Sequence, residues 1–330
     1  MMARTVTRRV ATVTYAANQT VQTQLTGITG RLRRIFLEMK GSLLVSTAGT
    51  NYAEARNPGS LVPSIMLRLN HQTVLKQGRW NDWVDRDKVF HKAQAQTVCS
   101  AAAATYAFRS RINLPFITPM GARPIDTVLN LGPDDRLDLD LTFGSDTNLV
   151  NSSTAQSLSV TPTINVIAEM EAHIEGVTPD PVGIYRETAF ETNPGSGANT
   201  DYQGLQMTTA RGMEYHHLII VQEDNVANTG RTLESTITDL TLQQQGGGQV
   251  SQPVGIIGGE QLQYDFNVRN NKADSVPTGI YPILFQPNFE GRMTYNLDSS
   301  DLDDLRFLVD LAAPTTNAYL RVLQGTIERF

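Results

Sequence analysis

The sequence predicts an all-β protein made of two related domains in tandem. Short segments alternate apolar and polar residues and are bounded by turn residues, as strands do. Only 18% of the residues are charged, while Thr, Asn, Gln, Gly and Ser are abundant, a composition typical of strands and turns. A paired pattern also occurs twice. Leu137–Phe143 and Ile164–Glu169 flank a polar loop, and Leu305–Leu311 and Tyr319–Leu323 flank Ala312–Asn317.

Two further pairs of segments keep the same order in both halves, although they match more loosely. Gly30–Leu32 resembles Gly230–Leu233, and Thr105–Phe108 resembles Gly279–Ile283. We interpret this as a weak internal repeat of domain size. The predicted parts are an arm at 1–29, a first domain at 30–170, a connection and surface loop at 171–205, and a second domain at 206–330.

The first half begins with a stretch that alternates β-branched and polar residues, which predicts an extended arm rather than a domain. Arg31–Val45 follows as a strand pair, with Ile35, Leu37 and Met39 on one face. Leu61–Leu69 predicts another strand. Asp87–Ala104 is the best helix candidate, because Asp87 can cap it and apolar residues fall near one stripe.

The second half contains similar short elements. Val177–Gly183 and Asn193–Asn199 have the character of a connection, and Tyr215–Gln222 is a strongly apolar strand. Leu233–Gln243 and Gln261–Val268 alternate around a glycine turn. Strands this short and this often interrupted are typical of sandwiches and jelly rolls.

The net charge of -6 hides an asymmetry between the beginning of the chain and the rest. Residues 1–40 hold seven cations against Glu38, a net charge of +6 that leaves -12 for the remainder. A basic end on an acidic body predicts a surface that faces phosphate, in nucleic acid or lipid headgroups. A solvated tail is the alternative. The candidate residues are Arg4, Arg8, Arg9, Arg31, Arg33 and Arg34.

No apolar run approaches the roughly 20 residues that span a bilayer, and the N-terminus lacks the apolar core of a signal peptide. The sequence therefore predicts a protein that is made and kept in a cytoplasm. Cys99 is the one cysteine, so an intrachain disulfide is impossible. Its Ala-rich surroundings favour a buried, inert thiol over a nucleophile.

The search for reactive or metal-binding motifs predicts no catalytic site, no cofactor and no enzyme. The five histidines lack zinc-site spacing, and the adjacent His216 and His217 are expected on opposite faces of a strand. Gly255–Gly259 is interpreted as a hairpin turn rather than a phosphate loop. Asp298, Asp301 and Asp303 are weak candidates for a hard cation, and a solvated turn is favoured over calcium.

Both tryptophans lie in Trp80–Asp85. A core or intersubunit anchor is the default interpretation of such a pair. The alternative function, a carbohydrate-binding or carbohydrate-active β-sandwich, would use Trp80 and Trp83 as a stacking platform with Asp82 and Asp85 beside it.

A late segment suggests a family. Phe289–Leu297 holds a glycine and a short β segment that ends near Asn296, and a polar Asp-rich turn and Leu305–Leu308 follow. The chain resembles the double jelly-roll major capsid proteins of tailless icosahedral viruses, and among them those of membrane-containing bacteriophages. Leu297 and Asp298 stand where related chains often have an aromatic residue or Ser-Arg, so the match is partial.

The resemblance implies two eight-stranded jelly rolls, a basic N-terminal arm and one or two short helices. It further implies a homotrimer with a near-hexagonal outline that tiles an icosahedral shell of a virion assembled in the host cytoplasm. Penton and minor capsid proteins would be partners, and the arm would face an internal membrane or the genome. A spike or fibre protein is a third possibility, but the sequence has no repetitive shaft.

Overall fold

A computed structural model describes residues 5–46, 52–53, 56–90, 96–118, 127–151, 156–171, 181–226, 230–245, 252–258, 278–285, 297–299, 304–314 and 316–330. Strands dominate this part of the chain, which divides into two compact units, Met1–Thr188 and Ala189–Phe330. Within the described residues no helix is long and apolar enough to cross a bilayer.

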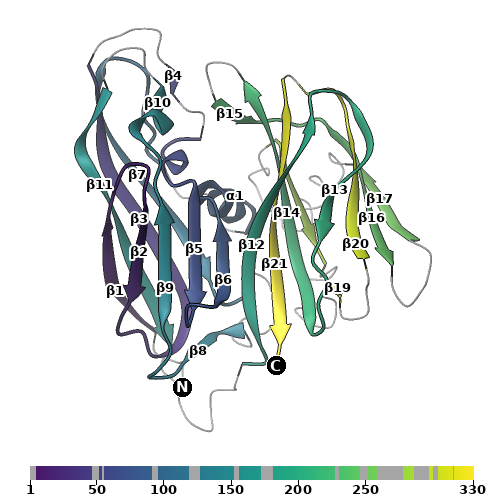
Figure 1. Cartoon of the computed structure of the whole chain (residues 1–330), viewed down its shortest axis with the longest axis horizontal. Coiled ribbons are helices and arrows are strands. Elements are labelled where there is room, and N and C mark those ends of the chain that lie inside the picture. Colours follow the sequence, from purple (N-terminus) through teal and green to yellow (C-terminus); the bar gives the residue numbers. More distant parts are fainter. Residues whose placement is uncertain are drawn as a thin grey trace. The chain divides into compact units, whose positions relative to one another are not determined.

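The first unit consists of two facing sheets (Figure 1). The strand order of one is β1-β11-β3-β7, and that of the other is β2-β9-β5-β6. The bounds in the first sheet are β1 Thr5–Thr14, β11 Gln156–Glu171, β3 Gly30–Val45 and β7 Ala104–Pro115, with β8 Leu129–Leu131 also pairing with β3. Those in the second are β2 Thr20–Leu25, β9 Leu137–Thr142, β5 Ser64–Leu69 and β6 Thr73–Gly78. The short strands β4 Tyr52–Ala53 and β10 Val150–Asn151 pair with each other.

The second unit repeats this arrangement. One of its sheets has the order β12-β21-β14-β18, from β12 Gly183–Gly195, β21 Ala318–Arg329, β14 Met213–Val226 and β18 Ile280–Leu284. The other has the order β13-β20-β16-β17, from β13 Asn199–Met207, β20 Asp304–Leu311, β16 Ile237–Gln245 and β17 Gln252–Gly258. The strands β15 Gly230–Leu233 and β19 Leu297–Asp298 also pair with β14.

The strand order identifies both units as jelly rolls. The four strands of each of the two sheet orders given above are the eight principal strands of a unit. When they are numbered along the chain, both units have one sheet in the order 1-8-3-6 and one in the order 2-7-4-5. This order arises when a long antiparallel hairpin is wrapped into two sheets. The all-β double jelly roll that the sequence predicted is therefore confirmed.

The repeat proposed from the sequence corresponds in part to equivalent strands. The closing strand pairs are equivalent, as β9 with β11 and β20 with β21, and so are β7 and β18. The match of Gly30–Leu32 to Gly230–Leu233 is not equivalent. It relates the start of β3 to β15, whereas the third principal strand of the second unit is β14.

The structure places strands where the sequence predicted an arm and a connection. Thr5–Thr14 pairs with β11 and Thr20–Leu25 pairs with β9, so residues assigned to the arm at 1–29 form the first two strands of the first roll. In the same way, β12 and most of β13 lie within the predicted connection at 171–205. These are polar strands whose few buried residues produce only a weak alternation, which resembles an irregular segment.

The helix α1 spans Trp80–Phe90 rather than the predicted Asp87–Ala104. The backbone N–H of Arg79 donates to the Asp82 carboxylate at 2.6 Å at its start. Thr97 forms a β-bridge with Arg109, and β7 already begins at Ala104. Pairing with strands overrides the helix propensity of the Ala-rich stretch, since propensity is only a weak prior. Gly59–Leu61 and Asp146–Asn148 are 3-10 turns in the same unit.

Each unit has its own apolar core between its two sheets. In the first unit, Ile35, Leu37 and Met39 of β3 are fully buried, as the alternation predicted. In the second, Leu305 and Val309 of β20 are fully buried with their neighbours on β14. Two separate cores are expected when two domains are joined in one chain.

Candidate functional site

The most unusual feature of the first unit is a group of ionic side chains without solvent contact. Lys76 of β6, Arg86 of α1 and Glu187 of β12 are each 0% exposed. Lys76 Nζ lies 3.3 Å from Glu187 Oε2, and Arg86 Nε lies 2.9 Å from Glu187 Oε1. Burying a charge is costly unless it is paired and hydrogen-bonded, so the carboxylate of Glu187 is the centre that makes both cations tolerable.

Aromatic side chains complete this buried ionic cluster. The Tyr185 hydroxyl donates to Glu187 Oε1 at 2.8 Å, and Trp83 Nε1 donates to Oε2 at 3.3 Å. Lys76 Nζ also lies 4.2 Å from the ring centroid of Tyr185 and 5.4 Å from that of Phe116. Cation–π contacts of this kind gain strength when they are desolvated.

Burial and neighbouring charge change the ionisation of the cluster. Burial, with a further contribution from Arg86, lowers the pKa of Lys76 to about 8 although Glu187 opposes the shift. Burial acts to raise the pKa of Glu187, but Arg86 and Lys76 outweigh it, so this pKa is lowered. The adjacent Asp87 has its pKa raised to about 6 by burial, against the opposing charge of Arg86.

The Lys76 shift gives a testable pH dependence. Its folded-state pKa of about 8 lies below the ordinary value of 10.5, so between these values the folded protein binds fewer protons than the unfolded one. Lys76 should therefore make the free energy of unfolding rise as the pH increases through this window. Urea unfolding across the window should show this rise in the wild type and a weaker one in Lys76→Met. Equal slopes in the two proteins would contradict the assignment.

The cluster is an anchor rather than a reactive centre. It joins a strand, a helix and the first part of β12, where Glu187 is in parallel register with Lys76. Its charged groups pair with one another and are closed to solvent, so a substrate cannot reach them. The cluster holds the first part of β12, which belongs to the first unit, against β6 and α1.

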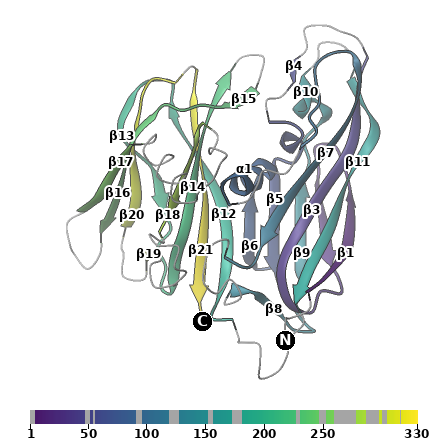
Figure 2. The same ribbon diagram turned by 180° about the vertical axis from the view of Figure 1, so that it is seen from behind.

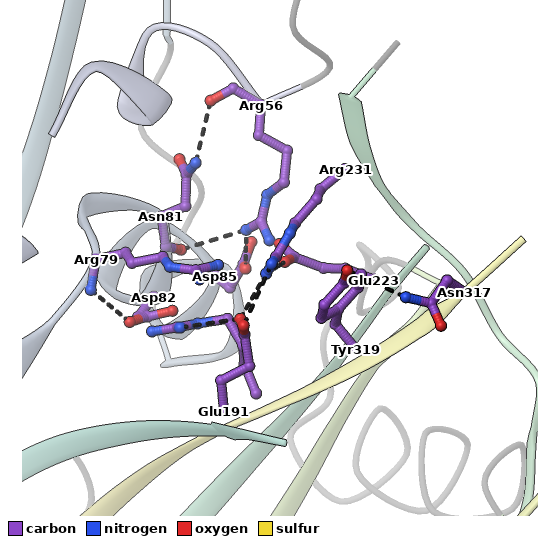
Figure 3. A network of polar contacts seen from close by, with 11 residues as sticks. Arg56, Arg79, Asn81, Asp82, Asp85, Glu191, Glu223, Arg231, Asn317 and Tyr319 are labelled. Atoms are coloured by element: carbon purple, nitrogen blue, oxygen red, sulfur yellow. Dashed lines mark hydrogen bonds and ion pairs between the residues drawn. The ribbon is translucent and has the colours of Figure 1, made fainter. Parts of the chain in front are cut away.

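A second polar network of the first unit ties the segment around Arg56 to α1 (Figure 3). Arg56 forms an ion pair with Asp85, which is fully buried. The Asn81 side chain donates to the carbonyl of Arg56 at 3.2 Å. The Cys99 N–H donates to Asn57 at 2.7 Å and ties the next loop to this segment. These contacts give an irregular segment the hydrogen-bond partners that a strand would otherwise supply.

A corresponding network of the second unit is centred on Glu191 of β12 (Figure 3). Arg231 of β15 binds both of its oxygens, at 2.5 and 3.2 Å, and Arg321 of β21 approaches it at 3.3 Å. The guanidinium of Arg231 also lies 3.8 Å from the ring centroid of Tyr319. Bidentate arginine pairs are the strong kind of ion pair, so this network ties β12, β15 and β21 of the second unit together.

The prediction that His216 and His217 point to opposite faces is wrong. Their Nδ1 atoms lie 3.0 Å apart, and both rings are buried. The pairing of β14 with β21 slips between Tyr215 and His217, and such a bulge brings consecutive side chains to one side. The His217 ring lies against Gly325, where any Cβ would overlap it. The described residues contain no group of three metal-ligating side chains.

The tryptophans are core residues, and the carbohydrate interpretation has no support. Trp80 and Trp83 are 0% exposed, so neither can stack on a sugar. Trp80 Nε1 donates to Ser110 at 2.8 Å inside the unit. Asp82 and Asp85, which that interpretation placed beside them, are also buried.

The basic residues chosen from the sequence lie in different surroundings. Arg8 and Arg9 of β1 are exposed, whereas Arg31 is only 1% exposed. Arg33 and Arg34 approach the carboxylate of Glu169, at 3.8 and 3.0 Å. Arg4 lies outside the described residues.

The remaining candidates are the aspartates of the predicted turn and Cys99. Asp301 and Asp303 lie outside the described residues, and Asp298 is described only as the end of β19. Cys99 is buried as predicted, and burial raises the pKa of its thiol to about 12, which keeps it protonated and inert.

Sequence reasoning missed the buried ionic cluster. Lys76 and Arg86 stand in ordinary polar positions of the sequence, and Glu187 follows Lys76 by 111 residues. One feature of the sequence could have indicated the cluster: Lys76 and Arg86 lie on either side of Trp83. A charge that is buried beside aromatic residues needs a partner of opposite charge.

Comparison with known proteins identifies the fold but not a close relative. No family model and no curated protein matches the sequence. Among solved structures, the major capsid protein of STIV aligns at 14% identity with a TM-score of 0.70, over 98% of this chain and 97% of that one. The major capsid protein of bacteriophage PM2 aligns at 12% identity with a TM-score of 0.65, over 99% and 98%.

A PBCV-1 virus capsid protein gives a TM-score of 0.61 at 12% identity, over 99% of this chain and 95% of that one. These neighbours are double jelly-roll proteins. The resemblance suggested by the sequence is confirmed at the level of the fold, over nearly the whole length of both chains.

Proposed function

We propose that this chain is a major capsid protein, a structural subunit of a viral shell rather than an enzyme. The observation that carries the proposal is the match of nearly the whole chain, both jelly rolls included, to capsid proteins of similar length. A single roll is shared by proteins of many functions, so it would argue weakly. Two rolls in tandem over the full chain are shared by a much narrower set of proteins than a single roll is.

The proposed assembly is a homotrimer with a nearly six-sided outline. Because each chain holds two units of the same strand order, three chains supply six similar β-sandwiches. A ring of three then closes with approximate sixfold character, and such trimers can tile an icosahedral shell.

Assembly would also cover an open sheet edge at strand β1. Among the described strands, β1 pairs only with β11. Its first five side chains are exposed, and that of Val6 is 47% exposed. An open edge with exposed apolar side chains is a site for unwanted pairing. Neighbouring subunits in a shell would cover it.

The finer parts of the proposal concern location and partners. The protein would be a virion component assembled in the host cytoplasm, with penton and minor capsid proteins beside it. An internal membrane or the genome would lie against a basic surface, for which the exposed Arg8 and Arg9 are the available cations of β1. Binding to vesicles of anionic lipid that weakens with salt would support this contact.

The test is the state of the purified protein. Sedimentation analysis should find a trimer, and electron microscopy should show particles with a six-sided outline or closed shells. A protein that stays monomeric at every concentration examined would overturn the proposal.

A further inference from the structure

We propose that the outer face of the sheet β1-β11-β3-β7 binds the acidic second unit of another copy of this chain. The inference rests on the proposed self-assembly and adds to it the surface and the force that join neighbouring subunits. Figure 2 shows the four strands of this sheet side by side.

The two faces of this sheet have opposite character. Ile35, Leu37 and Met39 point into the core, so Phe36, Glu38 and Lys40 point outward. Across the strand pairs, Arg109 stands opposite Lys40 and Arg111 stands opposite Glu38. On the other side of β3, Glu169 stands opposite Arg34. The outward side chains Arg34, Phe36, Glu38, Lys40, Arg109, Arg111 and Glu169, together with Arg33, are called the basic face.

The charged groups of the basic face are held in place by contacts with one another. Glu38 pairs with Lys40 at 3.1 Å and with Arg109. The Phe36 ring lies between two guanidinium groups, that of Arg34 at 5.2 Å and that of Arg111 at 4.0 Å from its centroid. Such side chains lose less freedom on binding than free ones, so the face is pre-organised.

The outer ends of these cations remain accessible. The side chains of Lys40 and Arg109 are 48% and 58% exposed, while that of Glu38 is 10% exposed. The basic face therefore presents five cations and two largely covered carboxylates, and its surface potential is positive.

The pattern favours a protein partner over a phosphate polymer. Two carboxylates stand among the cations, which would repel a dense row of phosphates but would match a surface of mixed charge. Arginine and aromatic side chains are also the residues enriched at the centres of protein interfaces.

The charge of the chain itself identifies that partner. Residues 1–188 hold 19 Lys and Arg against 16 Asp and Glu, whereas residues 189–330 hold 8 against 17. The first unit is thus +3 and the second -9. Every copy of the chain carries an acidic second unit, so this partner is always present at the same concentration as the basic face. Complementary charge steers and orients such an association.

The contact has a consequence for symmetry. It joins the first unit of one copy to the second unit of the next, so it is head-to-tail, and a head-to-tail contact forms a ring when its rotation closes. Closure after three copies is the homotrimer proposed above.

The experiment uses the full chain with two single charge reversals, Lys40→Glu and Arg109→Glu. Each leaves Glu38 one cationic partner. The matched control is Arg136→Glu, the same charge change at an exposed position before β9. Sedimentation equilibrium should show that each reversal weakens association at low salt by at least about tenfold, while the control stays near the wild type. Wild-type association should itself weaken with added salt.

Lys40→Gln and Arg109→Gln provide a milder pair for which folding is easier to preserve, and circular dichroism verifies the fold of every variant. A wild type that is trimeric, with variants that associate equally well, overturns this inference and leaves the proposed function intact. A monomeric wild type overturns both. Variants that associate normally but lose binding to phosphatidylserine vesicles would assign the face to lipid and overturn the inference.

Discussion

Replacing Glu187 with alanine should destabilise the first unit by about 3–5 kcal/mol, because it leaves two buried cations without their shared counter-ion. Lys76 and Arg86 are both fully buried, and Glu187 is the acceptor at 3.3 and 2.9 Å from them. Calorimetry should show the melting temperature falling by about 10 °C or more. Glu187→Gln should be nearly as damaging, since it keeps the shape but loses the charge.

The control is Asp140→Ala in the same unit. Asp140 forms an ion pair with Arg68, but the two side chains are 17% and 27% exposed, so its loss should cost about 1 kcal/mol or less. Replacing Lys76, Arg86 and Glu187 together by apolar residues should recover much of the stability. Equal losses in Glu187→Ala and Asp140→Ala would show that the buried ionic cluster is not the anchor described here.

Deleting residues 1–29 should prevent the first unit from folding, whereas an arm outside the domain could be removed without this effect. The deletion removes β1 and β2, which occupy edge positions in the two sheets of that unit. It also removes the buried side chains of Val13, Leu25 and Ile28 from the core. Burial of each such side chain contributes about 1.5–3 kcal/mol, and the stability of a whole domain is only about 5–15 kcal/mol.

Limited proteolysis and near-ultraviolet circular dichroism would measure the effect. The first unit of the truncated protein should be digested rapidly and should lose the fixed environment of Trp80 and Trp83. Deletion of residues 1–4 alone, which precede β1, serves as the control and should leave cooperative unfolding unchanged. A protein without residues 1–29 that melts like the wild type would restore the interpretation as an arm.

The elements that the sequence predicted well are those with one buried face. The alternation of Leu137–Phe143 and Leu305–Leu311 located strands β9 and β20, and Ile35, Leu37 and Met39 marked the inner face of β3. Period-two patterns arise directly from a strand that faces a core on one side. The all-β class and the repeated closing strands were predictable for this reason.

Strands with little burial were not predictable in the same way. In β1 only Val13 is fully buried among its ten residues, so the pattern is too weak to separate a strand from an extended arm. The beginning of β12 was interpreted as a connection for a different reason. Its burial alternates regularly, but the buried positions hold Gly183, Tyr185 and Glu187 instead of aliphatic residues.

The sequence by itself determined the class, the duplication and the inner faces of the central strands, because these follow from hydrophobic periodicity within a few residues of chain. Tertiary structure alone decided which strands became neighbours, that the two imidazoles of His216 and His217 meet at a bulge, and that Lys76, Arg86 and Glu187 share one site. Each of these depends on pairing between segments far apart in the chain. Local alternation of apolar and polar residues does not encode such pairing. The interaction energy that favours one pairing over another arises only when both partners are buried together.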